Sequence, residues 1–233
     1  MGKRTYRTAT GRRRAHQQQK RAVCLIIISV VCIVFMILLC RKLFFPAHGE
    51  EDVTVMNESG SISDMSDAPP LDVQLLTVNE YSRPQIKLDQ VKGIVMHYTA
   101  NPGSTAQENR NYFENLKDSH TTKASSHFVI GLDGEIIQCI PSSEISYASN
   151  DRNSDALAIE CCHPDESGKF TDATYQSMVE LTGWLCKKFD LNSSDVIRHY
   201  DITGKDCPKY FVEHEDAWEQ FKKDVAARIE ELK

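Results

Sequence analysis

The longest apolar run of the chain extends over nineteen residues, from Ala22 to Cys40, and Ser29 is its only clearly polar member. A helix of this length spans roughly 28 Å at ~1.5 Å per residue, close to the hydrocarbon thickness of a bilayer. The run therefore predicts a transmembrane helix. A cleaved signal peptide is the alternative, but its apolar region is ordinarily ~7–15 residues long and ends in small residues, whereas Arg41 and Lys42 follow here.

Shorter apolar runs dominate the chain beyond residue 80. Gly93–Tyr98 and Ala156–Cys161 predict buried strands. His127–Ile130 and Glu135–Ile140 flank an Asp-Gly pair, which is a strong turn signal, and so predict two paired strands.

Three further segments predict helices. Ser104–Gln107 resembles a capping box and opens a helix to about Lys117. Thr171 is a suitable N-cap for a helix to about Phe189, and Asp216–Leu232 places apolar residues on one face of a closing helix. Strands in the middle with helices on both sides predict an α/β domain, a central mixed β-sheet flanked by helices.

The remaining segments are polar. Residues 46–79 are rich in Asp, Glu, Ser and Pro without sustained periodicity, which indicates a flexible acidic linker. The predicted organisation is a basic tail over 1–21, a membrane anchor over 22–45, the linker over 46–79 and a globular domain over 80–233.

Charge is distributed unevenly along the chain. Eight Lys and Arg residues precede the apolar run, two follow it directly, and all 33 acidic residues lie at or after Glu50. The positive-inside rule therefore predicts a single-pass membrane protein with a cytoplasmic N-terminus and the domain outside the cell. The outer part carries a formal charge of about −16, which argues against nucleic acid as a partner. Five of the eight cysteines lie outside the run, and because five is odd, at least one is not in an intramolecular disulfide.

Candidate chemistry is concentrated near the C-terminus. His199 and Cys207 are zinc-ligand types eight residues apart, in a loop that contains Gly204. His97, near the end of an apolar strand, is the best third ligand. A histidine hydrogen-bonded at a strand end is the structural alternative.

Two charged residues extend this picture. Glu160 ends an apolar run, where desolvation raises a carboxyl pKa toward the range useful to a general base. Lys205 lies two residues before Cys207 and could stabilise negative charge on a carbonyl oxygen. Each has the alternative of an ordinary solvated side chain.

The chain resembles the zinc-dependent N-acetylmuramoyl-L-alanine amidases of the amidase-2 family, which includes phage endolysins and is related to peptidoglycan-recognition proteins. The resemblance covers roughly Pro84 to Phe211. The motifs that carry it are, in order, VMHYT, SSHFVIGLDGEI, DALAIECC and VIRHYDITGKDCP.

The resemblance implies that His97, His199 and Cys207 bind Zn²⁺, and that the substrate is the amide between the lactyl group and L-alanine in peptidoglycan. It implies that Glu160 takes a proton from the attacking water and delivers it to the leaving nitrogen. Lys205 matches a lysine that some members place before the last ligand, where it would share the oxyanion with the metal.

Two positions depart from the family pattern. Some members carry a tyrosine directly before the histidine that matches His127, and here that residue is Ser126. Many members have Trp-His-Ala after the central hairpin, whereas this chain has Tyr147-Ala148-Ser149. His127 either orients a metal ligand or is a packed strand histidine.

Other functions remain as alternatives. A binding module would hold muropeptide without cutting it. A thiol hydrolase would use Cys161 or Cys162 with His163, but adjacent residues of a strand point to opposite faces. A membrane-bound structural protein would leave the motifs unexplained.

Overall fold

The computed structural model describes residues 67–232. The predicted basic tail, the predicted anchor and the first part of the predicted linker lie outside the described residues. Within residues 67–232, no helix combines the length and the apolar character needed to cross a bilayer.

The described elements follow one another in the order β1 (Asp72–Val73), β2 (Gly93–Tyr98), α2 (Ala106–Ser119), β3 (Phe128–Ile130), β4 (Ile136–Gln138), the 3₁₀ turn η1 (Asn150–Ser154), β5 (Ala156–Cys161), α3 (Asp172–Lys188), the 3₁₀ turn η2 (Ser193–Asp195), β6 (Val196–Arg198), α4 (His199–Thr203), α5 (Lys209–Glu213) and α6 (Glu215–Glu231).

The strands between residues 67 and 232 form one six-stranded sheet in the order β1-β4-β3-β5-β2-β6. β2 pairs in parallel with β5 and β6, and β3 pairs in parallel with β5. β4 is antiparallel to β3, across the predicted turn. The predicted mixed sheet flanked by helices is therefore confirmed.

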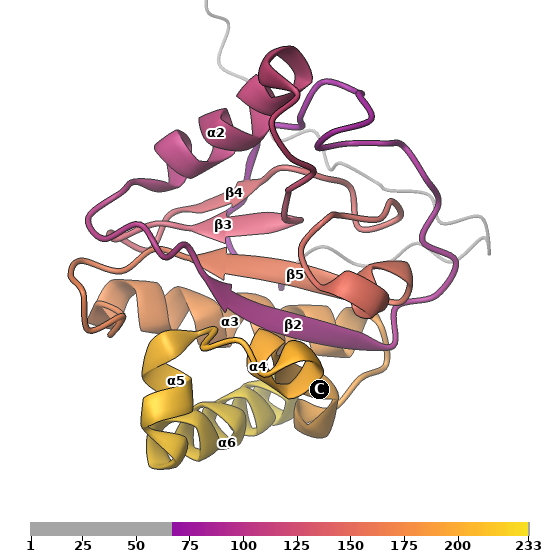
Figure 1. Cartoon of the computed structure of the whole chain (residues 1–233). Coiled ribbons are helices and arrows are strands. Elements are labelled where there is room, and N and C mark those ends of the chain that lie inside the picture. The colour runs from indigo at the N-terminus through magenta and orange to yellow at the C-terminus, as the bar shows by residue number, and fades with distance from the viewer. Residues whose placement is uncertain (1–66, 233) are drawn as a thin grey trace, which may run out of the picture. The chain divides into compact units, whose positions relative to one another are not determined.

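Helices cover both faces of the sheet (Figure 1). On one face, α3 and α6 pack on the larger apolar core, which includes Met96, Ile159 and Phe221. On the other face, α2 packs over β3 and β4 through Phe113 and Leu116. Because both faces are covered, the central strands are nearly continuous apolar runs, which is why they could be predicted.

Most predicted elements are confirmed within one residue. Gly93–Tyr98 and Ala156–Cys161 are strands over the predicted bounds. Thr171 caps α3 by accepting a hydrogen bond from the backbone N–H of Thr174. The predicted capping box of α2 is wrong by one residue, because Thr105 and Glu108 form it. Ser104 instead donates its hydroxyl to the carbonyl of Asn101.

The predicted end of the linker at residue 79 is also wrong. Asp72–Val73 adds a parallel strand to β4, and the Leu76 side chain is 1% exposed. Arg110 of α2 donates hydrogen bonds to the carbonyls of Gln74 and Leu75. These backbone pairs, hydrogen bonds and apolar contacts attach residues 72–76 to β4 and α2, so the packed domain begins before residue 80.

Candidate metal centre

The carboxyl ends of three parallel strands bring the predicted site residues together. His97 on β2 lies opposite Glu160 on β5 in the strand register, and His199 follows directly after β6. Residues paired across parallel strands share a face. Glu160 is also paired with Val129, which packs under α2. His97 and Glu160 therefore lie on the α2 face, over the β5–β2 half of the sheet.

His97, His199 and Cys207 form a compact group of potential metal ligands. One ligand atom from each lies within 4.8 Å of the others, and all three residues are buried. The His97 and His199 rings are 4.7 Å apart between centroids, and Cys207 Sγ is 3.7 Å from His97 Nδ1. Two imidazoles and a thiol match the donor set of a zinc site that keeps its fourth position open.

Electrostatics keep the imidazoles in the form that binds metal. Desolvation, the neighbouring His199 ring and the Lys205 charge lower the pKa of His97 well below its usual value. Desolvation and Lys205 also lower the pKa of His199. Both imidazoles are therefore neutral ligands at neutral pH.

The thiol behaves differently. Desolvation, with the charge of Glu160, raises the pKa of Cys207 to about 12, although a hydrogen bond from the backbone N–H of Tyr98 opposes the rise. The thiol keeps its proton until a metal ion displaces it.

The hydrogen bonds of the two rings show which nitrogens face the centre. His97 Nε2 lies 3.0 Å from Ser149 Oγ, and His199 Nε2 lies 2.9 Å from Asn150 Oδ1. His199 Nδ1 is buried without a hydrogen-bond partner, and His97 Nδ1 faces Cys207. An unpartnered buried nitrogen is costly in an unliganded protein and is satisfied by a metal.

Sequence reasoning missed Ser149 and Asn150 as partners of the ligands. The only sign in the sequence was that Tyr147-Ala148-Ser149 departs from the family pattern. The contacts join residues 49 and 52 positions apart, and no local spacing encodes such a pair.

Glu160 lies beside this group with an environment that favours its protonated form. Desolvation raises its pKa to about 8, and Lys205 opposes the shift. Oε2 is buried and has no hydrogen-bond partner. Lys205 is exposed on the loop after α4, and its charge acts on Glu160 and on all three potential ligands.

Arg198 holds the segment that carries His199, at the start of α4, and Cys207 in the loop after it. Its guanidinium is largely buried and forms ion pairs with Asp201 and Glu215 at 2.9 and 2.6 Å. Nη1 also donates to the carbonyl of Phe211 at 2.9 Å. One side chain thus joins the end of β6 to α4, α5 and α6.

His127 and Ser126 have structural roles. The backbone N–H of Ala158 donates to His127 Nδ1, and His127 Nε2 lies 2.8 Å from the carbonyl of Glu144. Burial lowers the pKa of His127 to about 4. Ser126 is buried and donates its hydroxyl to the carbonyls of Phe128 and Ala158. Of the two possibilities, the packed strand histidine is the one observed.

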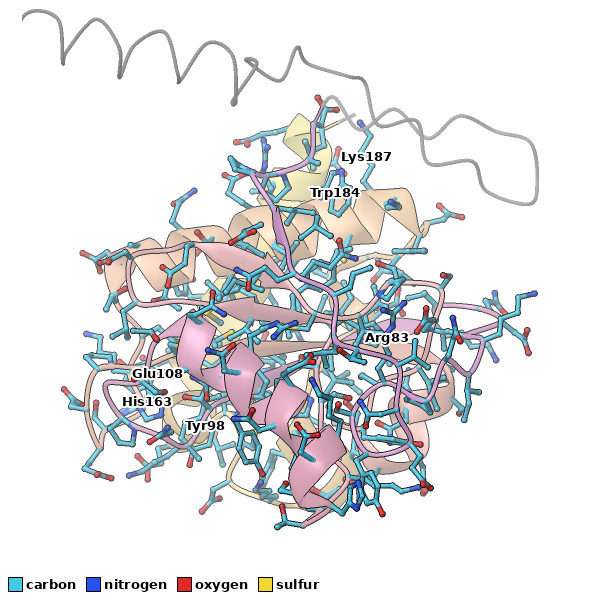
Figure 2. All side chains as sticks on the ribbon, turned by 90° about the horizontal axis from the view of Figure 1, so that it is seen from above. Arg83, Tyr98, Glu108, His163, Trp184 and Lys187 are labelled. Atoms are coloured by element: carbon cyan, nitrogen blue, oxygen red, sulfur yellow. The ribbon has the colours of Figure 1, made fainter. Side chains whose placement is uncertain are left out.

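The cysteines proposed for a thiol hydrolase are poorly suited to nucleophilic chemistry. Desolvation raises the pKa of Cys161 well above its usual value and that of Cys162 to about 12. His163 Nδ1 contacts the carbonyl of Asp165, and the ring packs beside Tyr98 at 5.0 Å between centroids (Figure 2). The thiolate–imidazole pair that this alternative needs is therefore not formed. The five cysteines between residues 67 and 232 are all free and buried, as an odd count required of at least one.

Comparison with known proteins assigns the part of the chain that holds this centre to a protein family. The model of the N-acetylmuramoyl-L-alanine amidase family (Amidase_2) matches residues 87–210, which is more than half of the chain. The chain belongs to this amidase family. The resemblance identified from the motifs is thereby confirmed, and the matched residues include the three potential ligands and Glu160.

Individual amidases are similar over the same domain. The N-acetylmuramoyl-L-alanine amidase CwlL of Bacillus licheniformis is 36% identical over 161 residues, which cover 64% of this chain and 44% of that protein. BlyA of Bacillus subtilis (strain 168), also named an N-acetylmuramoyl-L-alanine amidase, is 34% identical over 175 residues, 66% of this chain and 46% of that protein. The chain thus spans about half the length of these relatives.

Solved structures share the fold, including that of XlyA of Bacillus subtilis (strain 168), which is named an N-acetylmuramoyl-L-alanine amidase. The catalytic domain of XlyA superposes with a TM-score of 0.56 at 26% identity, covering 67% of this chain and 99% of that one. PlyL has a TM-score of 0.59 at 22% identity, covering 67% of this chain and 97% of its own. The sheet and its covering helices are therefore the amidase fold.

Proposed function

We propose that the domain hydrolyses the amide bond between the lactyl group of N-acetylmuramic acid and L-alanine in peptidoglycan, with zinc as its metal. The observation that carries the proposal is the buried group of His97, His199 and Cys207, with Glu160 adjacent in the sheet. All four lie in the region that matches the amidase family.

The ligand chemistry supports zinc as the metal. The two neutral imidazoles and the thiol would hold the ion through His97 Nδ1, His199 Nδ1 and Cys207 Sγ. A bound zinc ion supplies a Lewis acid for the amide carbonyl and makes a water more acidic.

Glu160 is the proton carrier in this proposal. Its carboxylate accepts a proton from the attacking water and passes that proton to the leaving L-alanine nitrogen, so the proton balance is closed within one catalytic cycle. In the metal-free protein desolvation raises the pKa of Glu160 to about 8, and a bound cation would lower it toward the range where a carboxyl both takes and gives a proton near neutral pH. The Lys205 ammonium, whose charge reaches the same centre, would stabilise the developing oxyanion.

Mass spectrometry of digested peptidoglycan tests the proposal. We expect the full chain, purified in detergent and loaded with zinc, to release peptides with new free L-alanine amino groups. Glu160→Gln should lower the rate by about 10²–10⁴-fold, the usual contribution of a positioned acid or base. A chelator should abolish the activity and added zinc should restore it.

The products separate this function from its alternatives. Cleavage of glycan strands or of peptide–peptide bonds would contradict the proposed bond. Muropeptide binding without hydrolysis by the zinc-loaded protein would identify a binding module. Lys205→Ala should also lower the rate, and Lys209→Ala is its matched control, because Lys209 lies nearby in the sequence but donates to the carbonyl of Glu166.

A further inference from the structure

The turn η1 holds both potential histidine ligands from the side opposite the centre. Ser149 directly precedes the turn and Asn150 is its first residue. Their side-chain oxygens contact Nε2 of His97 at 3.0 Å and Nε2 of His199 at 2.9 Å. Two adjacent residues thus contact two ligands from different elements, His97 on β2 and His199 at the start of α4.

The contact with Asn150 selects a tautomer of His199, and the contact with Ser149 orients the His97 ring. An amide oxygen only accepts hydrogen bonds, so Asn150 Oδ1 requires a proton on His199 Nε2. A neutral ring with its proton on Nε2 has its lone pair on Nδ1, and His199 Nδ1 is the buried nitrogen without a partner. The Ser149 hydroxyl can donate or accept, so its contact with His97 Nε2 fixes the orientation of the ring, in which His97 Nδ1 faces Cys207.

The backbone around these two residues is fixed by the turn itself. Asn153 Oδ1 accepts hydrogen bonds from the N–H groups of Ala148 and Ser149 at 3.0 and 2.6 Å. Asn150 has φ 52°, a left-handed conformation that asparagine tolerates better than most residues. The two side-chain oxygens are thereby placed before any metal binds.

We propose that Ser149 and Asn150 are positioning residues for metal binding: both fix the ring orientation of a histidine ligand, and Asn150 also sets the tautomer of His199. The proposal rests on the proposed zinc centre. It gives a role to the segment before η1, where many family members have Trp-His-Ala and this chain has Tyr147-Ala148-Ser149. Ser149 is 2% exposed, whereas Asn150 is exposed, so the Ser149 contact has the larger effect.

Metal affinity and the spectrum of a cobalt-substituted centre test this role in the full chain in detergent. We expect Ser149→Ala to weaken zinc binding by about 10–100-fold, as loss of a hydrogen bond to a ligating histidine typically does, measured by competition with a chromophoric chelator. The visible bands of the Co²⁺ protein should change in position or intensity. Asn150→Gly, which suits a positive φ, should weaken binding by a smaller factor.

Three controls distinguish positioning from a general loss of structure. Ser154→Ala removes a hydroxyl from the same turn, where it contacts only the carbonyl of Asp151, and should leave affinity and spectrum unchanged. Asn150→Asp keeps an acceptor oxygen and should retain the affinity lost in Asn150→Gly. The metal-free unfolding midpoint of each variant should stay close to that of the wild type.

Two results would overturn the inference. One is a Ser149→Ala protein with the zinc affinity and cobalt spectrum of Ser154→Ala. The other is a loss of affinity in Ser149→Ala matched by an equal loss in Ser154→Ala. A wild-type protein that binds no zinc would instead refute the proposed function on which the inference rests.

Discussion

The Glu160 carboxyl should reduce the stability of the metal-free domain as the pH rises. Desolvation raises its pKa from 4.5 to about 8, so the folded state binds this proton more tightly than the unfolded state does. The stabilisation that the bound proton of Glu160 gives to the folded state is therefore fully present below pH 4.5. It is lost progressively as the pH rises toward 8.

The size of the effect follows from the pKa difference. At about 1.4 kcal/mol per pKa unit, a rise from 4.5 to about 8 corresponds to at most about 5 kcal/mol. The residue as a whole keeps intermediate exposure while Oε2 is buried without a partner. Solvent at the exposed part reduces the cost, and we expect about 2–4 kcal/mol.

Comparison with Glu160→Gln isolates this contribution, because glutamine does not titrate. Unfolding of both proteins in urea, with zinc removed by a chelator, gives the free energy of unfolding at each pH from 4.5 to 8.5. The variant should match the wild type near pH 4.5 and be more stable by about 2–4 kcal/mol at pH 8.

The histidines of the centre do not obscure the result. Their lowered pKa values make stability fall as the pH drops below about 6.5, but this contribution is common to both proteins and cancels. A stability difference that stays constant from pH 4.5 to 8.5 would refute the reasoning. The expected result would mean that the chain keeps a destabilising carboxyl where its chemistry needs one.

Two further predictions concern other parts of the chain. Burial alone raises the pKa of Glu114, but hydrogen bonds from Lys117 and Thr77 and the charge of Arg110 outweigh it and lower the pKa to about 2. Glu114→Gln should therefore lower the free energy of unfolding in urea by about 1–2 kcal/mol at pH 7. This difference between variant and wild type should vanish as the pH falls from 4.5 toward 2. A difference that persists at pH 2 would contradict the prediction. For the predicted anchor, protease added to wall-free cells that express the full chain should degrade residues 67–232 and leave an N-terminal tag protected, whereas digestion of the tag would contradict the predicted orientation.

Local sequence determined the elements of this domain. The strands Gly93–Tyr98 and Ala156–Cys161 are predictable because both faces of the sheet are covered and most positions are apolar, with His97 and Glu160 near the strand ends as exceptions. Thr171 is predictable as a cap because it accepts a hydrogen bond from a residue only three positions away. The error at α2 arose because Ser104 and Thr105 both satisfy the capping pattern, and only the backbone path decides between them.

The linker boundary could not be predicted from composition. Residues 72–79 follow an acidic, Ser- and Pro-rich segment and show no sustained periodicity, yet they lie against β4 and α2 through backbone pairing and the Arg110 guanidinium. Every residue carries backbone hydrogen-bonding groups whatever its side chain, so the side chains do not reveal which backbone groups will pair. Only the folded arrangement shows that these residues belong to the domain.

For the centre itself, the sequence determined which potential ligands and charged residues are present. The family motifs indicated which of them belong to one site. Tertiary structure alone decided the rest. Parallel pairing places His97 beside Glu160, the turn after β6 brings His199 and Cys207 to His97, and contacts over 49 and 52 positions select the nitrogens that face the centre. Strand register and ring orientation depend on how distant segments pack, which spacing along a chain does not encode.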